Sequence, residues 1–397
     1  MNAPERRPLT PDFHEHDWRP PASVSVDDGF VTMTWDDGAR LDAYSLWLAE
    51  NAEGFGLEPS SRESMLEPRD LPQPGDLVDA AIGPDGAVEL RWADGRTNRV
   101  HPGWLRFVAD GRHAPAGGLP DPVPWTTGDL DAPPTLDGTN VLHDDDAMMQ
   151  FLIEVTRSGL CRLVDTPTSP DFVGRLASAI GPIRETNFGP VWSVESKVEP
   201  DSTANTGLDL GQHTDLPTRE VPPGFQFLHC LENTVAGGAS RMSDGWSVSE
   251  AIRREHPEAY SALTELDWAF MNRSPDAEHR WIGPIIDRGS RHQPLTLRAF
   301  YPVRTAPHMD RADIPRAYEA LRVFAEMARD QRFQLEYQFA PGDLVAFDNR
   351  RILHGRNGFD GAGVRHLRGC YLDHDDLYSR LRVLARRHPT TQREVPT

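Results

Sequence analysis

The length, composition and charge of the chain exclude several classes of protein. Its 397 residues exceed one average domain, and a net charge of −20 disfavours a nucleic-acid partner, because binding to a phosphate backbone needs a basic surface. Three widely spaced cysteines, no run of about 18 apolar residues and no apolar N-terminal segment predict a cytoplasmic protein without a disulfide framework or a membrane partner.

The N-terminal part of the chain indicates an arm followed by a small domain. Residues 1–20 are polar and contain proline, so we expect a flexible arm. Residues 21–112 are predicted to form a small β-rich domain, because short alternating runs are separated by Asp-Gly turns that favour hairpins. A stretch dense in Pro, Gly and Asp then predicts a linker over 113–139. The alternating runs are 30–35, 78–82 and 87–92.

Residues 140–397 are predicted to form a larger domain, mainly β with flanking helices. Apolar residues spaced by three and four predict helices over 144–158, 172–180, 247–255 and 313–330. Many strands with long insertions and few helices predict a double-sheet jelly roll. The strand-like runs are 225–230, 293–300, 333–339, 343–347 and 367–372.

A His-x-Asp motif supplies candidate metal ligands. Residues two apart on a strand face the same side, so His213 and Asp215 are predicted to direct an imidazole and a carboxylate at one metal, before Pro217 ends the strand. The motif alone is weak evidence, because 15 His and many Asp produce chance matches. His14 and His16 offer similar ligands, but they lie in the predicted arm, where no surrounding contacts would fix them.

A second segment strengthens this metal site. Residues 341–356 predict a turn, an apolar strand and a polar turn that presents His354. Two His and one carboxylate on one face of Fe(II) leave positions open for a 2-oxo acid and dioxygen. Arg365 opens the next strand, and its guanidinium suits the remote carboxylate of 2-oxoglutarate. The alternative, a surface His354 and a solvated Arg365, is disfavoured by the order and spacing of these residues.

Several stretches of the chain follow one family pattern. They are 186–189, Trp192, 213–215, 228–233, 237–240, 244–245, 347–356, 365–371 and 379–384. Through them, residues 140–385 resemble the taurine dioxygenase superfamily and, within it, the γ-butyrobetaine and trimethyllysine hydroxylase branch. The resemblance implies a double-stranded β-helix core, Fe(II), 2-oxoglutarate as co-substrate and dioxygen. It also implies that Arg365 holds the C5 carboxylate with Ser240 nearby, and it is compatible with a homodimer.

The small domain shares the resemblance through 41–48 and 92–105. Relatives hold a structural zinc there with three Cys and one His. Residues 49–54, which directly follow Leu48, contain no Cys, and Arg96 stands in the place of the His. We therefore expect the domain fold without zinc.

The resemblance also implies a site for a cationic or zwitterionic small molecule. In this branch a quaternary ammonium lies in an aromatic cage, because ring faces attract a cation that has no hydrogen-bond donors. The cage positions correspond to Phe188, Trp192 and Tyr371, and the fourth position, usually aromatic, corresponds to Asn205. Hydroxylation of γ-butyrobetaine or a similar trimethylammonium compound is the function these residues favour.

The anionic end of the substrate leaves alternatives open. Relatives use Asn residues there, whereas this chain offers Ser202, Arg298 and Arg304 in the corresponding regions. An inward arginine would suit a trimethylammonio-phosphonate, and the same chemistry on a sulfonate or an amino acid is a further alternative. A catalytically silent sensing or scaffold protein is disfavoured by the complete ligand set, and a zinc hydrolase leaves Arg365 unexplained.

Overall fold

The computed structural model describes residues 6–195, 206–272, 274, 276–289, 295–359 and 363–387. The chain divides into two compact units, Met1–Gly118 and Leu119–Thr397, and each has its own hydrophobic core. Within the described ranges, no helix has the length and apolar character that crossing a membrane requires.

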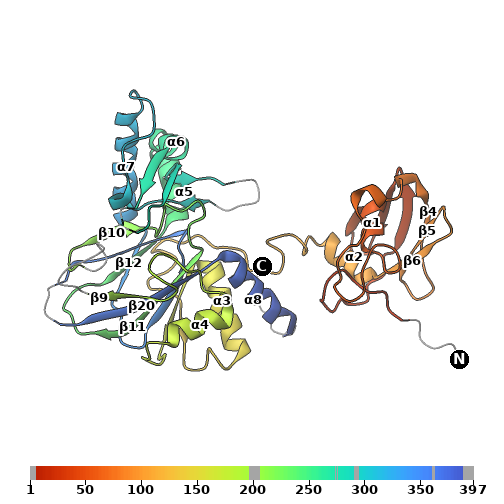
Figure 1. The fold of residues 1–397 in the computed structure, drawn as a ribbon, viewed down its shortest axis with the longest axis horizontal. Coiled ribbons are helices and arrows are strands. Elements are labelled where there is room, and N and C mark those ends of the chain that lie inside the picture. Colours follow the sequence, from red (N-terminus) through yellow and green to blue (C-terminus); the bar gives the residue numbers. More distant parts are fainter. Residues whose placement is uncertain are drawn as a thin grey trace. The chain divides into compact units, whose positions relative to one another are not determined.

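The small unit consists of two antiparallel sheets and two helices (Figure 1). Its elements are β1 (Ser23–Asp27), β2 (Phe30–Thr34), β3 (Arg40–Tyr44), α1 (Ser45–Asn51), η1 (Pro68–Asp70), η2 (Pro74–Asp76), β4 (Leu77–Ile82), β5 (Val88–Trp92), β6 (Thr97–Val100) and α2 (Pro102–Ala109). The strand orders are β1-β2-β3 and β4-β5-β6. The predicted Asp-Gly turns are confirmed, because Gly38, Gly86 and Gly95 all adopt positive φ, which glycine does without steric cost.

The segment before β1 lies against the small unit. The His16 side chain is 5% exposed and its ring centroid lies 5.0 Å from that of Phe107 in α2. Trp18 Nε1 donates a hydrogen bond of 2.8 Å to the carbonyl oxygen of Asp85. In the described part of the expected flexible arm, His16 and Trp18 therefore hold the chain against the small unit. The polar composition of the arm did not predict these contacts.

Arg96 packs against aromatic rings at the position where the resemblance places a zinc-binding His. Its guanidinium carbon lies 3.6 Å from the ring centroid of Phe55, and Phe55 stacks on Trp92 with centroids 5.0 Å apart. The stack joins the segment after α1 to the β5–β6 hairpin, through contacts in which a cation is attracted to a ring face.

The large unit contains the two sheets of a jelly roll. Its strands are β7 (Thr135–Asp137), β8 (Leu160–Val164), β9 (Trp192–Glu195), β10 (Leu210–His213), β11 (Phe225–Asn233), β12 (Ser240–Asp244), β13 (Trp268–Met271), β14 (Arg280–Gly283), β15 (Ile286–Asp287), β16 (Thr296–Leu297), β17 (Gln334–Tyr337), β18 (Leu344–Asp348), β19 (Ile352–Arg356) and β20 (Arg365–Leu372). A six-stranded sheet has the order β7-β8-β18-β11-β20-β9, and a four-stranded sheet has the order β10-β19-β12-β17. Apolar side chains from both sheets, among them Cys230, Met242 and Phe347, form one core cluster. The predicted fold class is confirmed.

Two groups of helices cover the sheets. The helices are α3 (Asp145–Ser158), α4 (Phe172–Ile180), α5 (Gly245–Glu255), α6 (Pro257–Glu265), α7 (Ile314–Arg329) and α8 (His374–Arg387), with a short η4 (Tyr301–Val303). Helices α3, α4 and α8 pack on the six-stranded sheet, whereas α5, α6 and α7 form a separate cluster beside the four-stranded sheet (Figure 1). The four predicted helices correspond to α3, α4, α5 and α7.

The predicted linker differs from the structure in its second half. The boundary between the units follows Gly118, and residues 119–139 belong to the large unit. Trp125 is 2% exposed and its backbone N–H donates to Asp244 Oδ2 over 3.0 Å. Strand β7 pairs in parallel with β8. The Pro- and Gly-rich composition of residues 119–139 predicted a linker. Composition does not indicate that a Trp in such a segment is buried, or that part of it forms a strand at the edge of a sheet.

Candidate functional site

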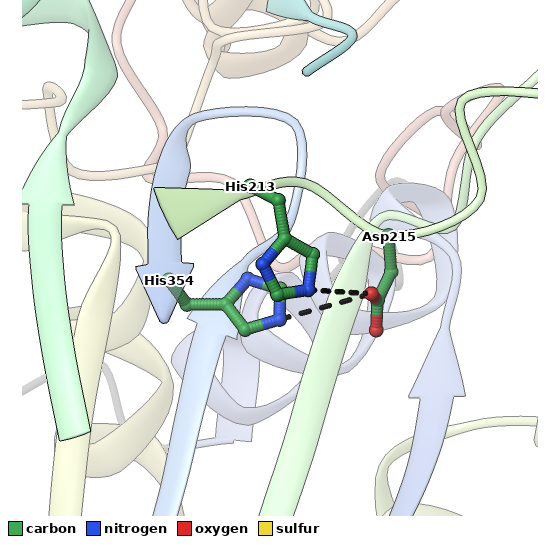
Figure 2. A group of neighbouring side chains, drawn as sticks. All are labelled: His213, Asp215 and His354. Carbon is green, nitrogen blue, oxygen red and sulfur yellow. Dashed lines mark ion pairs between the residues drawn. The ribbon is translucent and has the colours of Figure 1, made fainter. Parts of the chain in front are cut away.

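Three candidate ligands converge where β10 meets β19. His213 is the last residue of β10 and pairs in register with His354 in β19. One ligand atom from each of His213, Asp215 and His354 lies within 4.8 Å of the others. Nε2 of His213 lies 3.3 Å, and Nε2 of His354 3.8 Å, from Oδ1 of Asp215. Figure 2 shows both imidazoles directed at this one oxygen.

The local structure of two ligands differs from the prediction. Strand β10 ends at His213, so Asp215 lies in the following bend, beside Leu216 with a φ of 53°. His354 lies within β19 instead of in a turn. The three side chains still meet, because the pairing of β10 with β19 brings His354 beside His213 and the bend turns Asp215 toward both.

Hydrogen bonds and burial prepare these groups for a cation. Nδ1 of His213 lies 2.9 Å from the Gly211 carbonyl oxygen, so it donates there and leaves the Nε2 lone pair free. Burial, and then the neighbouring His213, lower the pKa of His354 to about 3, so this imidazole is neutral at physiological pH. Burial raises the pKa of Asp215, but the neighbouring His213 and His354 and a hydrogen bond from Tyr371 hold it below its usual range. Two imidazoles and one carboxylate fit a divalent transition-metal ion with open positions.

Asn349 fixes the bend that carries Asp215. It is fully buried, its Oδ1 accepts from the Asp215 backbone N–H over 2.6 Å, and its Nδ2 donates to the Asp215 carbonyl over 3.1 Å. It also donates to the Pro223 carbonyl oxygen over 3.2 Å. The sequence contained this residue within the family pattern of 347–356, but nothing in the motif indicated that its amide would hold the ligand loop.

Arg298 supports the same loop. Its guanidinium donates to the carbonyl oxygens of Pro217, Arg219 and Glu220 over 3.1, 2.6 and 2.7 Å, and the side chain packs over Trp281. Both terminal nitrogens are therefore occupied by the main chain. These contacts give Arg298 a structural role in the loop that carries Asp215.

Arg304 lies among aromatic rings of the α5–α7 cluster. Its guanidinium carbon is 4.7 Å from the ring centroid of Trp268 and 5.6 Å from the centroids of Tyr301 and Tyr318. Ser202, the remaining candidate for the substrate anion, lies outside the described residues, as does Asn205. The described residues therefore give neither arginine a contact with the metal-ligand group.

Arg365 is a buried cation without a carboxylate partner in the described part of the chain. It begins β20, is 6% exposed, and its Nε finds no hydrogen-bond partner there. Burial, and then the charge of Arg356, lower the pKa of Arg365 to about 10. A buried charge without a counter-charge lowers the stability of the fold, so the surroundings of Arg365 fit an anionic ligand.

Ser240 lies at the same end of the core as Arg365. It is 5% exposed and stands in register with Tyr337 on one neighbouring strand and with Arg356 on the other. Tyr337 and Arg356 both act electrostatically on Arg365. The sequence did not indicate a role for Tyr337. A Tyr in a short strand gives no indication that its hydroxyl will be buried close to an arginine.

Two of the expected cage residues lie together. The rings of Trp192 and Tyr371 have centroids 5.2 Å apart, and the Trp192 ring lies over Gly369, where a Cβ would come within 2.3 Å of it. Phe188 lies in a turn with 53% exposure, and in the described residues it forms no ring contact with this pair. Tyr371 also donates a hydrogen bond of 2.7 Å to Asp215 Oδ2, which the sequence did not indicate.

A family model and several known proteins match this chain. Residues 124–371 match the model of the taurine catabolism dioxygenase TauD, TfdA family. A γ-butyrobetaine dioxygenase from Pseudomonas sp. (strain AK-1) is 39% identical over 372 residues, which cover 92% of this chain and 97% of that protein. The γ-butyrobetaine dioxygenase of Homo sapiens is 30% identical over 384 residues, with coverages of 90% and 95%.

A solved structure shows the same fold. The crystal structure of AAD-2 in complex with Mn(II) and N-oxalylglycine superposes with a TM-score of 0.50 at 14% identity. The match covers 64% of this chain and 97% of AAD-2. At this identity the likeness concerns the arrangement of sheets and helices alone.

Proposed function

Because the chain belongs to the taurine catabolism dioxygenase TauD, TfdA family, we propose that it is an Fe(II)- and 2-oxoglutarate-dependent hydroxylase of a small trimethylammonium compound such as γ-butyrobetaine. The observation that carries the proposal is the convergence of His213, Asp215 and His354 within 4.8 Å. These three residues would hold the iron.

The chain's own residues bind and orient the reactants. When bound, Fe(II) supplies the oxidative chemistry that couples decarboxylation of 2-oxoglutarate by dioxygen to hydroxylation of an aliphatic carbon. Arg365 pairs with the remote carboxylate of 2-oxoglutarate, and Ser240 lies beside that end of the co-substrate. This assignment is supported by the buried Arg365 charge, which lacks a carboxylate partner among the described residues.

A trimethylammonium group is the substrate feature that the aromatic residues support. Trp192 and Tyr371 pack together beside Asp215, and aromatic faces stabilise a quaternary ammonium by about 0.5–2 kcal/mol each. The two named γ-butyrobetaine dioxygenases, which match nearly the full length of this chain, make γ-butyrobetaine the first compound to test. A substrate held in this way is positioned for reaction without a covalent bond to the protein.

Succinate production tests the proposal. Iron-loaded protein is incubated with 2-oxoglutarate, dioxygen and one compound at a time, and succinate and hydroxylated product are measured by mass spectrometry. The panel contains γ-butyrobetaine, trimethyllysine, a trimethylammonio-phosphonate, taurine and free amino acids. We expect a trimethylammonium compound to raise succinate production most, with product formed in equal amount.

Two outcomes would contradict different parts of the proposal. Stimulation by taurine or an amino acid, and by no trimethylammonium compound, would reject the ammonium site while keeping the chemistry. Failure of the protein to bind or consume 2-oxoglutarate under any condition would favour a silent scaffold. Asp215→Ala serves as the control that separates enzymatic succinate from background decarboxylation.

A further inference from the structure

The two oxygens of the Asp215 carboxylate have different surroundings. Oδ1 lies 3.3 Å from Nε2 of His213 and 3.8 Å from Nε2 of His354 (Figure 2). Oδ2 accepts a hydrogen bond of 2.7 Å from the Tyr371 hydroxyl. One oxygen therefore faces the imidazoles and the other is held by a phenol.

Tyr371 is fixed by contacts other than this hydrogen bond. It lies on β20 opposite Gln226 of β11, is 3% exposed, and its carbonyl oxygen accepts from the Arg184 backbone N–H over 2.8 Å. Its ring contacts Trp192. Because β20 belongs to the six-stranded sheet, whereas β10 and β19 belong to the four-stranded sheet, the Tyr371 hydroxyl connects the carboxylate to the opposite wall of the core.

The orientation of the carboxylate decides how many metal positions stay open. Two imidazoles and a single carboxylate oxygen leave just enough positions for a chelating 2-oxo acid and dioxygen. A carboxylate that binds through both oxygens takes one of those positions. A donor that engages Oδ2 disfavours this, because a hydrogen bond to a charged oxygen is strong and competes with the metal for that oxygen.

We propose that Tyr371 is a positioning residue for the metal centre, whose hydroxyl holds Asp215 Oδ2 so that Oδ1 alone is presented to the metal. The inference rests on the proposed function. Since the same ring packs with Trp192 at the expected ammonium site, Tyr371 connects that site to a metal ligand. The hydroxyl and the aromatic face then have separable effects, one on the metal and one on the substrate cation.

Tyr371→Phe separates these effects, because it removes the hydroxyl and keeps the ring. The matched control is Tyr378→Phe, which removes a hydroxyl from a tyrosine of α8 that packs against Phe225 and His374. For each full-length protein, Mn(II) affinity is measured by calorimetry without co-substrate. γ-Butyrobetaine affinity, and the ratio of hydroxylated product to succinate, are measured with the iron-loaded protein.

We expect Tyr371→Phe to bind Mn(II) about 10-fold or more weakly, in the range found when a partner of a metal ligand is removed. The ratio of product to succinate should fall, because 2-oxoglutarate is consumed without hydroxylation when the carboxylate shifts. The affinity for γ-butyrobetaine should change little, since the ring remains. Tyr378→Phe should match the unmodified protein in all three measurements.

Unchanged Mn(II) affinity in Tyr371→Phe would by itself overturn the inference. The calorimetric result needs no substrate, so it tests Tyr371 even if no trimethylammonium compound stimulates succinate and the proposed function fails. If Tyr371→Phe does not fold, Tyr371→Met carries the Mn(II) measurement, because it also lacks the hydroxyl and its flexible side chain adapts to the space.

Discussion

The small unit and the ligand-binding end of the large unit differ in how they accommodate charge. In the small unit, Arg106 forms ion pairs of 2.7 Å with both Asp37 and Asp110. In the large unit, Arg365 is 6% exposed and has no carboxylate partner in the part of the chain that the structure describes. An unpaired buried charge lowers stability unless a ligand of opposite sign binds. This difference indicates that the binding site for an anionic ligand lies in the large unit.

A second comparison lies within the large unit. Arg351 is 1% exposed and pairs with the fully buried Asp244 over 2.7 Å, with a further hydrogen bond to the Val123 carbonyl oxygen. Arg351 and Arg365 are thus both buried, but only Arg351 has its counter-charge from the chain. Burial alone does not mark a binding residue: Arg298 is also buried without a carboxylate, but its guanidinium donates to backbone carbonyl oxygens, whereas Arg365 has no carboxylate partner and no partner for its Nε among the described residues.

The largest effect should come from Asp215→Ala. Loss of the only carboxylate among the three described ligands should weaken metal binding by at least about 100-fold, since even partners outside the ligand set contribute about 10- to 100-fold. Coupled hydroxylation should disappear with it. Metal calorimetry and succinate assays measure both, with Asp37→Ala in the small unit as the control. Full activity in Asp215→Ala would show that the metal site is misassigned.

Separate substitutions of Arg351 and Arg365 test the difference between a buried arginine with a counter-charge and one without. Arg351→Met should lower the free energy of unfolding by about 3–5 kcal/mol, because it leaves Asp244 buried without its partner. Arg365→Met should leave the melting temperature of the ligand-free protein unchanged or raised, because it removes an uncompensated charge. It should also raise the KM for 2-oxoglutarate about 30-fold or more, corresponding to a loss of about 2 kcal/mol. A large drop in melting temperature for Arg365→Met would contradict the comparison.

The small unit should become less stable as pH falls below about 6.5. His101 Nδ1 accepts from the backbone N–H groups of Gly103 and Trp104, and burial, followed by the charges of His16 and Arg7, lowers the pKa of His101 to about 4. Between about pH 6.5 and pH 4, the His101 side chain is protonated in the unfolded chain and neutral in the folded one. The contribution of His101 to the stability of the small unit is therefore fully present above pH 6.5. It declines toward pH 4 by at most about 1.4 kcal/mol per pH unit.

Hydrogen exchange in α2 measures this dependence locally. His101→Asn keeps a side-chain oxygen that can cap the helix but does not titrate, so the variant should show a smaller loss of protection in α2 between pH 7 and pH 5. Identical pH dependence in the two proteins would mean that another group controls the stability of this helix.

The smallest effect is expected at the Arg96–Phe55 stack. Arg96→Gln should lower the stability of the small unit by about 0.5–2 kcal/mol, because it removes a cation from a ring face. Arg69→Gln, at a side chain that is 77% exposed, provides the control with an expected change near zero. Chemical denaturation compares the two variants. Equal stability of both would show that the stack contributes nothing beyond surface packing.

The pattern of apolar residues predicted most of the fold, because burial imposes it directly. The spacing in 313–330 predicted α7, and the run 343–347 predicted β18, whose residues are all buried. The prediction failed where composition and packing disagree. Trp125 and β7 lie in a Pro-rich stretch, yet they complete the core and one sheet edge.

The types of donor group and their order along the chain could be predicted from the sequence, because metal and carboxylate recognition depend on which groups are present. These residues are His213, Asp215, His354 and Arg365. Their surroundings depend on how the chain folds. The hydrogen bond from Tyr371 to Asp215, the Asn349 contacts and the commitment of Arg298 to the ligand loop all join residues far apart in the chain. Such contacts depend on strand register and on the bend after β10, which no local pattern encodes.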